Sequence, residues 1–258
     1  MSRPSIETLV TRSIRALMTV AFLAAGPAVA TPLNPFTDHT GEDHSSEDYS
    51  DAYLEGIILS SANLTKIKFE RADLTNAIAI SADLTDAKLK EATLTGADLS
   101  SADLTKASLK DAILSGAIMA SAVLTKTDLK DADLTGADFT NAILTDVKAK
   151  GANFANAVFD SASFASGDIK DAVFTNASLI GADLSGLKNA SKADFTGALY
   201  NGTTLLPVGV DTGGMVFVPE PSAGLLLMLG LGGLSVYSKR SGRSEGSTST
   251  RPAAPRRE

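Results

Sequence analysis

The chain has 258 residues, a formal net charge of -7, and neither cysteine nor tryptophan. Without cysteine there is no disulfide, thiolate ligand or cysteine nucleophile, so stability must come from packing. The acidic excess argues against nonspecific binding to nucleic acid or anionic lipid. The charge is uneven: residues 1–30 and 207–258 each carry +2, residues 31–50 carry -5 and residues 51–206 carry -6. This pattern indicates two targeting segments around a soluble body.

Residues 1–30 have the three parts of a secretory signal peptide. A basic region is followed by an apolar run over residues 16–25, and Gly26 and Pro27 end that run. The basic residues are Arg3, Arg12 and Arg15. The small residues Ala28 and Ala30 then form a cleavage pattern, so the mature chain would begin at Thr31. The alternative interpretation is a buried N-terminal helix.

Residues 31–50 are polar and acidic, and we expect them to form a disordered linker. Both histidines of the chain, His39 and His44, lie here among carboxylates. A metal site is conceivable, but the segment has no recognisable rigid element to fix ligand geometry, so a solvated linker is the favoured interpretation. We therefore predict neither a metal site nor a cofactor.

The middle of the chain repeats every five residues. From Leu54 to Leu184 a step of five gives 27 positions, of which 23 are Leu or Phe. Two residues before each of these positions, from Ala52 to Ala182, a second register holds Ala at 22 of its 27 positions. A period of five matches neither a helix nor a strand. It predicts a coil that turns at every repeat, with one large and one small side chain directed inward each time.

A second period, four times as long as the first, is visible in the polar positions. One column consists of Lys90, Lys110, Lys130, Lys150 and Lys170. A second consists of Asn76, Gly96, Gly116, Gly136, Asn156 and Asn176, residue types that tolerate positive φ in turns. Twenty residues are four pentapeptides, so residues 51–206 are predicted to form an all-β, four-sided solenoid.

Stretches such as 72–76 (Ala-Asp-Leu-Thr-Asn) and 132–136 (Ala-Asp-Leu-Thr-Gly) resemble the pentapeptide-repeat family. The resemblance implies a right-handed quadrilateral β-helix, a handedness that the spacing does not provide. Regularity ends at Leu184: the next clear unit is centred on Phe195, one residue later than two further repeats would place it. We therefore expect a bulged corner within residues 185–192. Residues 200–207 resemble a closing segment that caps the last coil. Residues 207–218 are expected to form a linker.

Two opposite sides of the predicted solenoid differ in character. One holds the lysine column and an adjacent acidic column, whereas the other has few charges. The candidate interaction face on that other side consists of Ile58, Ile78, Ile80, Ile118, Val158 and Ile180. It could bind a partner or a second copy of the chain. Alternatively it is ordinary β-surface, because Asp98, Asp138 and Asp160 interrupt it.

No enzyme is predicted. Outward lysines and aspartates on a convex solenoid lack the desolvated cleft that tunes catalytic groups. The repeat region also contains no phosphate-binding glycine loop and no nucleophile elbow. We therefore assign no catalytic residue.

Residues 219–243 resemble a PEP-CTERM sorting signal. Pro219, Glu220 and Pro221 precede an apolar run over residues 223–237, and a basic cluster follows. The cluster consists of Lys239, Arg240 and Arg243. The resemblance implies a separate hydrophobic helix in the membrane and cleavage by an exosortase after export. A tail over residues 244–258, expected to be disordered, departs from such signals, which normally end soon after the basic cluster.

The leading functional hypothesis is a non-enzymatic, exported scaffold, anchored in the inner membrane on the periplasmic side and then released to the cell surface or extracellular matrix. Its expected partners are the secretion machinery, an exosortase and the membrane, with a protein or polysaccharide ligand and a homodimer as further possibilities, and no nucleic acid. The alternative is a DNA-mimicking protein that binds a type II topoisomerase, as some pentapeptide-repeat proteins do.

Overall fold

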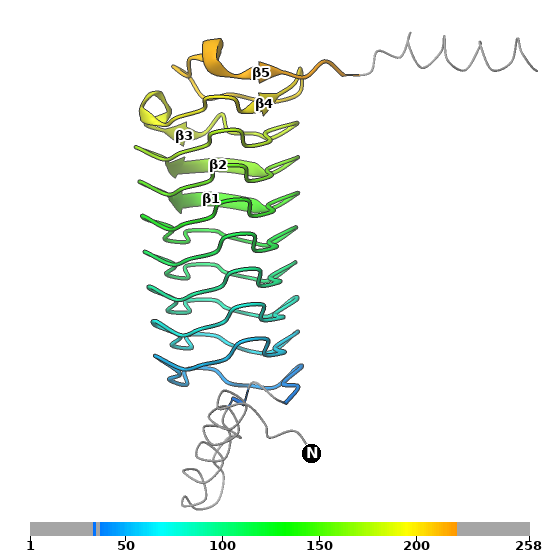
Figure 1. The fold of residues 1–258 in the computed structure, drawn as a ribbon, viewed down its shortest axis with the longest axis vertical. Helices are drawn as coiled ribbons and strands as arrows, with labels where there is room; N and C mark the ends of the chain where they lie inside the picture. The colour runs from blue at the N-terminus through cyan, green and yellow to red at the C-terminus, as the bar shows by residue number, and fades with distance from the viewer. Residues whose placement is uncertain (1–32, 35–36, 221–258) are drawn as a thin grey trace, which may run out of the picture. The chain divides into compact units, whose positions relative to one another are not determined.

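The computed structural model describes residues 33–34 and 37–220. From Asp38 onward the chain winds as a solenoid, with each coil lying on the next in parallel (Figure 1). A regular coil spans four pentapeptides and pairs with its neighbour once in each of them; Tyr53 pairs with Asp73, and Ile58 with Ile78. The solenoid therefore has four sides, as the spacing predicts. Its right-handed sense stays a prediction.

Most of the ladder consists of isolated bridges, because each side is only a few residues long before the chain turns. Continuous strands occur towards the C-terminal end. They are β1 (Ile143–Lys148), β2 (Ser163–Asp168), β3 (Leu187–Lys188), β4 (Leu199–Tyr200) and β5 (Val216–Phe217). The order β1-β2-β3 forms one parallel sheet, and β4 and β5 form a second parallel pair. Two 3₁₀ helices, η1 (Ala190–Lys192) and η2 (Thr212–Gly214), complete the described elements.

The core follows the two inward registers. Leu104 and Ala102 are both fully buried, as are almost all their counterparts in other coils. Phenylalanines stack from coil to coil: ring centroids of Phe139 and Phe159 are 4.8 Å apart, and those of Phe154 and Phe174 are 4.9 Å apart. Each buried Leu or Phe side chain contributes about 1.5–3 kcal/mol, so the repeated stack is the main source of stability.

The corners of the regular coils share one backbone conformation, from which Ser166 and Gly186 depart. Asn76, Gly96 and Gly116 have φ of 56°, 65° and 67°, which confirms the turn role predicted for their column. Corners with other residues adopt it too: φ is 60° at Lys106 and 59° at Glu91. A non-glycine residue in this region costs about 1–2 kcal/mol. Hydrogen bonds between coils, such as that from Lys106 N to Thr125 O (2.8 Å), offset this strain.

The acidic residue of the repeat shapes the turn that follows it. Asp73 Oδ1 accepts hydrogen bonds from Thr75 N (3.0 Å) and Thr75 Oγ1 (2.6 Å). The same arrangement, an aspartate bonded to a Thr or Ser two residues later, recurs at Asp98, Asp133, Asp138, Asp183 and Asp194. Such side-chain turns fix the chain as it leaves each side. This explains why Asp precedes the central Leu in so many repeats.

These hydrogen bonds make the solenoid sensitive to acid. Ser185 holds the pKa of Asp183 below its ordinary value, and Lys68 lowers the pKa of Asp48 to about 2. A folded-state pKa below the unfolded one stabilises the fold at pH values above the unfolded value, near 4, and this contribution is lost as pH falls towards 2. We expect thermal melts at pH 5, 3 and 2 to show a falling Tm. The fall should be shallower in Asp183→Asn, which keeps the acceptor but cannot titrate.

The solenoid begins earlier than predicted: from Asp38 to Ser50 the chain forms a coil and not a disordered linker. His39 N, His44 N and Tyr49 N donate to Ile58 O, Asn63 O and Lys68 O at 3.0, 2.9 and 2.7 Å. These three residues continue the central register, and Glu42 and Glu47 occupy positions that elsewhere hold Ala. The polar composition concealed the period because the inward side chains of this coil pair with one another instead of being apolar.

At the other end, the irregular corner predicted within residues 185–192 is confirmed. Val173 pairs with Asp194, one residue beyond the regular offset, and η1 accommodates the extra residue. The linker predicted over residues 207–218 is wrong, because η2 and β5 add a further partial coil up to Phe217. Val216 N donates to Ala198 O (2.9 Å), and β5 pairs with the otherwise open edge of β4.

The segments outside the solenoid are described only in part. The proposed signal peptide and most of the proposed sorting signal, including the hydrophobic helix, lie outside the described residues. Within the part of the chain that is described, the structure contains no helix with the length and apolar character needed to cross a membrane.

Candidate functional site

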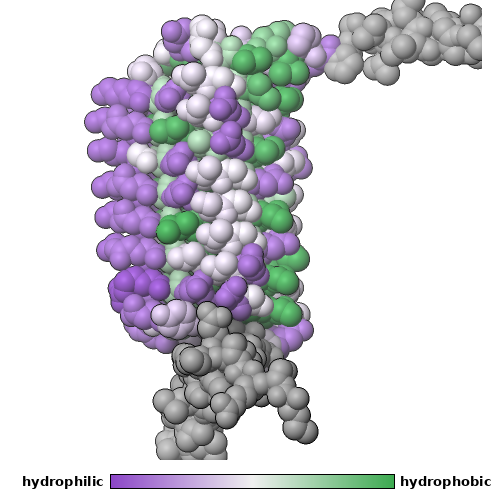
Figure 2. Space-filling model, in the orientation of Figure 1, coloured by the Kyte–Doolittle hydropathy of each residue, from purple (hydrophilic) through white to green (hydrophobic). Residues whose placement is uncertain are grey.

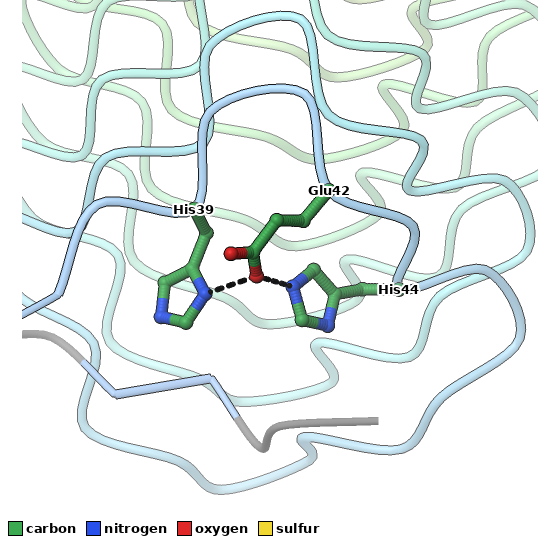
Figure 3. A group of neighbouring side chains, drawn as sticks. All are labelled: His39, Glu42 and His44. Atoms are coloured by element: carbon green, nitrogen blue, oxygen red, sulfur yellow. Dashed lines mark hydrogen bonds and ion pairs between the residues drawn. The ribbon is translucent and has the colours of Figure 1, made fainter. Parts of the chain in front are cut away.

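The first coil carries a group of polar side chains at the positions that hold Leu and Ala in later coils (Figure 3). His39 and His44 are only 3% and 1% exposed. Glu42 lies between them in the chain, and its side chain is 44% exposed. The chain turns at the Gly41 corner, between His39 and Glu42. His39 therefore lies on one side of the coil, and Glu42 and His44 lie on the next side, which brings the three side chains together.

One carboxylate oxygen connects the two histidines. Glu42 Oε2 lies 2.8 Å from His39 Nδ1 and 3.1 Å from His44 Nε2 (Figure 3). The imidazole rings are nearly perpendicular, with centroids 5.2 Å apart. Hydrogen bonding to both rings lowers the pKa of the Glu42 carboxyl. The carboxylate therefore stays ionised beside two nearly buried imidazoles.

Further groups surround this trio. The second nitrogen of His44, Nδ1, lies 3.0 Å from Glu47 Oε2, to which Tyr49 donates its hydroxyl at 2.5 Å. Burial, together with the Glu47 bond, raises the pKa of Tyr49. On the other side of the cluster, His39 Nε2 lies 2.6 Å from Thr37 Oγ1. The network is thus held by residues of consecutive sides of one coil.

The prediction that this segment lacks a rigid element is wrong, because the segment forms a coil of the solenoid. The argument against a metal site therefore no longer applies. In the described residues His39, Glu42 and His44 are the one group of three or more His, Cys, Asp or Glu side chains whose potential ligand atoms all lie within 4.8 Å of one another. A signal existed in the sequence: stepping back from Leu54 by five reaches Tyr49, His44 and His39.

The charged side of the solenoid carries ion-paired groups. Each lysine of the column that is followed by an acidic residue forms an ion pair with it: Lys90 with Glu91 at 2.9 Å, and Lys110 with Asp111 at 3.5 Å. Lys130 and Lys170 pair in the same way at 3.7 and 3.9 Å. Such exposed pairs contribute about 0–1 kcal/mol each. They balance the charge of this side.

The candidate interaction face lies along one side, as its spacing requires. Ile58, Ile78, Asp98 and Ile118 are successive partners in one bridged column. Ile78, Ile80 and Ile118 are about two-fifths exposed, whereas Ile58, Val158 and Ile180 are half-buried. Exposed Ile113 and Ile143 lie on the two adjoining sides. In the regular coils over residues 51–184 the lysine side carries no exposed large apolar residue. The contrast between a hydrophilic edge and scattered apolar side chains elsewhere is visible in Figure 2.

The sorting residues are only partly described. Pro219 and Glu220 follow β5, whereas Pro221, Lys239, Arg240 and Arg243 lie outside the described residues. The same holds for Ala28 and Ala30 at the proposed signal-peptide cleavage site.

Parallel coils of four pentapeptides each, an inward Leu, Phe and Ala stack, and polar outer columns define this protein as a β-solenoid. A family model described as "Pentapeptide repeats" matches in eight copies, over residues 48–76 and, in overlapping matches, 82–199. That is more than half of the chain, so the protein belongs to the pentapeptide-repeat family. Proteins of this family are generally structural or interaction proteins.

Several solved structures are similar. HetL, a pentapeptide-repeat protein involved in heterocyst differentiation regulation from the cyanobacterium Nostoc sp. strain PCC 7120, is 25% identical over 67% of this chain and 92% of its own, with a TM-score of 0.34. QnrB1, a plasmid-mediated fluoroquinolone resistance protein, is 17% identical over 76% of this chain and 100% of its own, with a TM-score of 0.47. Rfr23 from Cyanothece 51142 is 31% identical over 44% and 63%, with a TM-score of 0.30. No curated protein matches this chain.

Proposed function

We propose that this protein is a non-enzymatic scaffold that is exported from the cytoplasm. The observation that carries the proposal is the solenoid's regularity: its interior is filled by its own side chains, and its outer surface repeats the same positions in every coil. A surface of this kind can bind an extended or repetitive partner at several equivalent points. A protein or a polysaccharide outside the inner membrane would be such a partner.

Export is supported by the sequence at both ends. The proposed signal peptide over residues 1–30 would direct secretion, with cleavage after Ala30. The proposed signal over residues 219–243 would hold the chain in the inner membrane by its hydrophobic helix. An exosortase would then cleave near Pro219–Pro221 and release the solenoid, which ends at Phe217, to the cell surface or matrix.

Fractionation with mass determination of the mature product tests this proposal. We expect a periplasmic, membrane-bound or extracellular product that begins at Thr31 and, in a host with the exosortase, ends near Pro221. Deletion of the exosortase should leave the C-terminal segment attached. An Ala28→Asp, Ala30→Asp variant should retain residues 1–30, whereas Ser5→Asp, outside the cleavage pattern, should not. A full-length cytosolic product of the unaltered chain would refute export.

A second candidate is a DNA-mimicking protein that binds a type II topoisomerase in the cytosol. The net charge of -6 over residues 51–206 favours it. The lysine column interrupts the negative surface and favours the scaffold instead. Inhibition or protection of a purified type II topoisomerase by the chain, together with a cytosolic location, would reverse the ranking.

The candidate interaction face also predicts self-association through its exposed isoleucines. If Ile78 and Ile118 lie in a homodimer interface, the double variant Ile78→Glu, Ile118→Glu should be monomeric, because two charges would be buried against an apolar surface. Light scattering on both proteins measures this. A matched double variant on the adjoining sides, Ile113→Glu with Ile143→Glu, should leave the dimer intact. A monomer before any substitution would exclude the homodimer.

A further inference from the structure

The interior of the first coil differs from every later one in a way that packing does not require. In the regular coils over residues 52–184 the inward positions hold mainly Leu, Phe and Ala, and Thr127 is the one inward residue there with a hydrogen-bonding side chain. Here the same positions hold two imidazoles and two carboxylates, and their polar atoms converge. Burying such groups is costly unless each is satisfied. A bound ligand that interacts with the imidazoles and carboxylates would explain why these groups occupy the inward positions of the first coil.

We propose that His39, Glu42 and His44 bind one divalent transition-metal ion of the zinc class. Two imidazoles and one carboxylate form a well-established zinc ligand set, with water or a further ligand in the fourth position. The ligand atoms would be His39 Nδ1, Glu42 Oε2 and His44 Nε2. Imidazole nitrogen favours Zn²⁺, Ni²⁺ or Cu²⁺ over Mg²⁺ or Ca²⁺, whose sites are built from oxygen.

The distances suit such an ion. Metal–ligand bonds of about 2.0–2.1 Å in tetrahedral geometry place neighbouring ligand atoms roughly 3.3 Å apart. The two imidazole nitrogens lie 2.8 and 3.1 Å from Glu42 Oε2. Small side-chain shifts would open these two contacts by a few tenths of an ångström and bring the two imidazole nitrogens, which lie within 4.8 Å of each other, to the same spacing. The 44% exposure of the Glu42 side chain provides a route from solvent to the otherwise buried nitrogens.

The outer partner of His44 supports the metal site independently of these distances. Metal-binding histidines usually donate the other ring N–H to a carboxylate or a backbone carbonyl, which orients the ring. His44 Nδ1 faces Glu47 Oε2 at 3.0 Å, and Tyr49 in turn holds Glu47. His39 differs, because its Nε2 accepts a hydrogen bond from Asn34 N at 3.1 Å and also lies 2.6 Å from Thr37 Oγ1 and 3.2 Å from Asn34 O. Only His44 therefore has the outer carboxylate contact that is usual for a metal-binding histidine.

His44 shows why a cation belongs in the cluster. Both of its ring nitrogens face carboxylate oxygens, which only accept hydrogen bonds when ionised. A neutral imidazole has one N–H, so its remaining lone pair would point at a carboxylate. A metal ion bound to Nε2 and Glu42 removes that conflict, while Nδ1–H donates to Glu47. The alternative is a second proton on the His44 ring, and metal titration together with nitrogen-15 NMR distinguishes a bound metal ion from a doubly protonated imidazole.

The two histidines are the only ones in the chain, which makes the test specific. The untagged protein is stripped with a chelator and titrated with Zn²⁺ by calorimetry, and with Co²⁺ by visible absorption. We expect one ion per chain and a tetrahedral Co²⁺ spectrum. Nitrogen-15 NMR of the imidazoles should show metal at Nδ1 of His39 and at Nε2 of His44, with Nδ1 of His44 protonated.

Three variants complete the design. Glu42→Gln keeps the shape of the side chain but removes its charge, and His44→Gln retains a polar group near Nε2. Each should weaken Zn²⁺ binding by at least the ~10–100-fold that loss of an outer partner alone costs. Asp43→Asn is the matched control, because Asp43 Oδ1 accepts a hydrogen bond from Ser45 N on the outside of the same coil. It should bind Zn²⁺ as the unaltered chain does.

The outcomes that would overturn the proposal are distinct. A folded chain that binds no Zn²⁺ or Co²⁺, with both nitrogens of His44 protonated, would make the cluster a hydrogen-bonded end cap. Equal Zn²⁺ affinity in the unaltered chain, Glu42→Gln and His44→Gln would place the ion elsewhere. Circular dichroism of each variant confirms that the solenoid has folded. Because none of these measurements depends on export, they test the metal site separately from the proposed scaffold function.

Discussion

Leu104→Lys should abolish the cooperative thermal transition of the solenoid or lower its midpoint severely. Leu104 is fully buried in the inward stack, and its backbone N donates to Val123 O at 2.7 Å. Its carbonyl oxygen accepts from the hydroxyl of fully buried Thr127 at 2.8 Å. Lysine would lose about 1.5–3 kcal/mol of apolar burial and would also place an unpaired charge among Leu and Ala side chains. We expect a total loss above about 4 kcal/mol.

The matched control is Ser101→Lys, three residues earlier in the same coil. Ser101 is an exposed corner with φ of 58°, and the corners at Lys66, Lys106 and Lys126 already hold lysine in this conformation. The expected change is within about 0.5 kcal/mol. Leu104→Met, which conserves volume, should cost less than about 1.5 kcal/mol. Thermal and urea unfolding followed by circular dichroism measures all three. Equal effects of the two lysine substitutions would contradict the assignment of inward and outward positions.

Gly186→Ala should produce the second-largest loss of stability. Gly186 directly precedes β3, where the chain passes close to the coil below. A Cβ added at this position would lie well inside van der Waals contact of the Ala165 carbonyl oxygen and 2.5 Å from the Ala165 carbonyl carbon. Both atoms belong to the backbone, so no side-chain rotation relieves the clash. The coils must separate locally, with a loss of about 1–3 kcal/mol or more.

Gly116→Ala is the control for this prediction. Gly116 has φ of 67° but no atom within 4 Å of an added Cβ. Its cost is therefore limited to the conformational penalty of about 1–2 kcal/mol, which many corners of this solenoid already bear. Urea unfolding, with the transition monitored near the C-terminal end by a fluorophore, compares the two variants. If Gly186→Ala lowered the free energy of unfolding no more than Gly116→Ala does, the close contact between Gly186 and Ala165 would be contradicted.

The period of the inward residues was readable without coordinates, and for a clear reason. A solenoid brings every fifth residue to the same radial position, so a dry core forces the same residue types to recur from Leu54 to Leu184. The sequence also predicts the polar columns, because residues one coil apart occupy the same corner or the same side. The inserted residue after Leu184 could be located because it breaks an otherwise exact count.

Three features do not follow from the repeat pattern. The sequence does not predict the first coil, because its inward residues are polar and contact one another, as His39, Glu42 and His44 do, so hydrophobicity gives no signal there. The last partial coil was missed because β5 is stabilised by pairing with β4, across an irregular segment. Left-handed corners at lysine and glutamate are held by hydrogen bonds between coils and not by the residues' own preferences. Local composition predicts packing that repeats along the chain, whereas the ends of the solenoid form through contacts specific to each end.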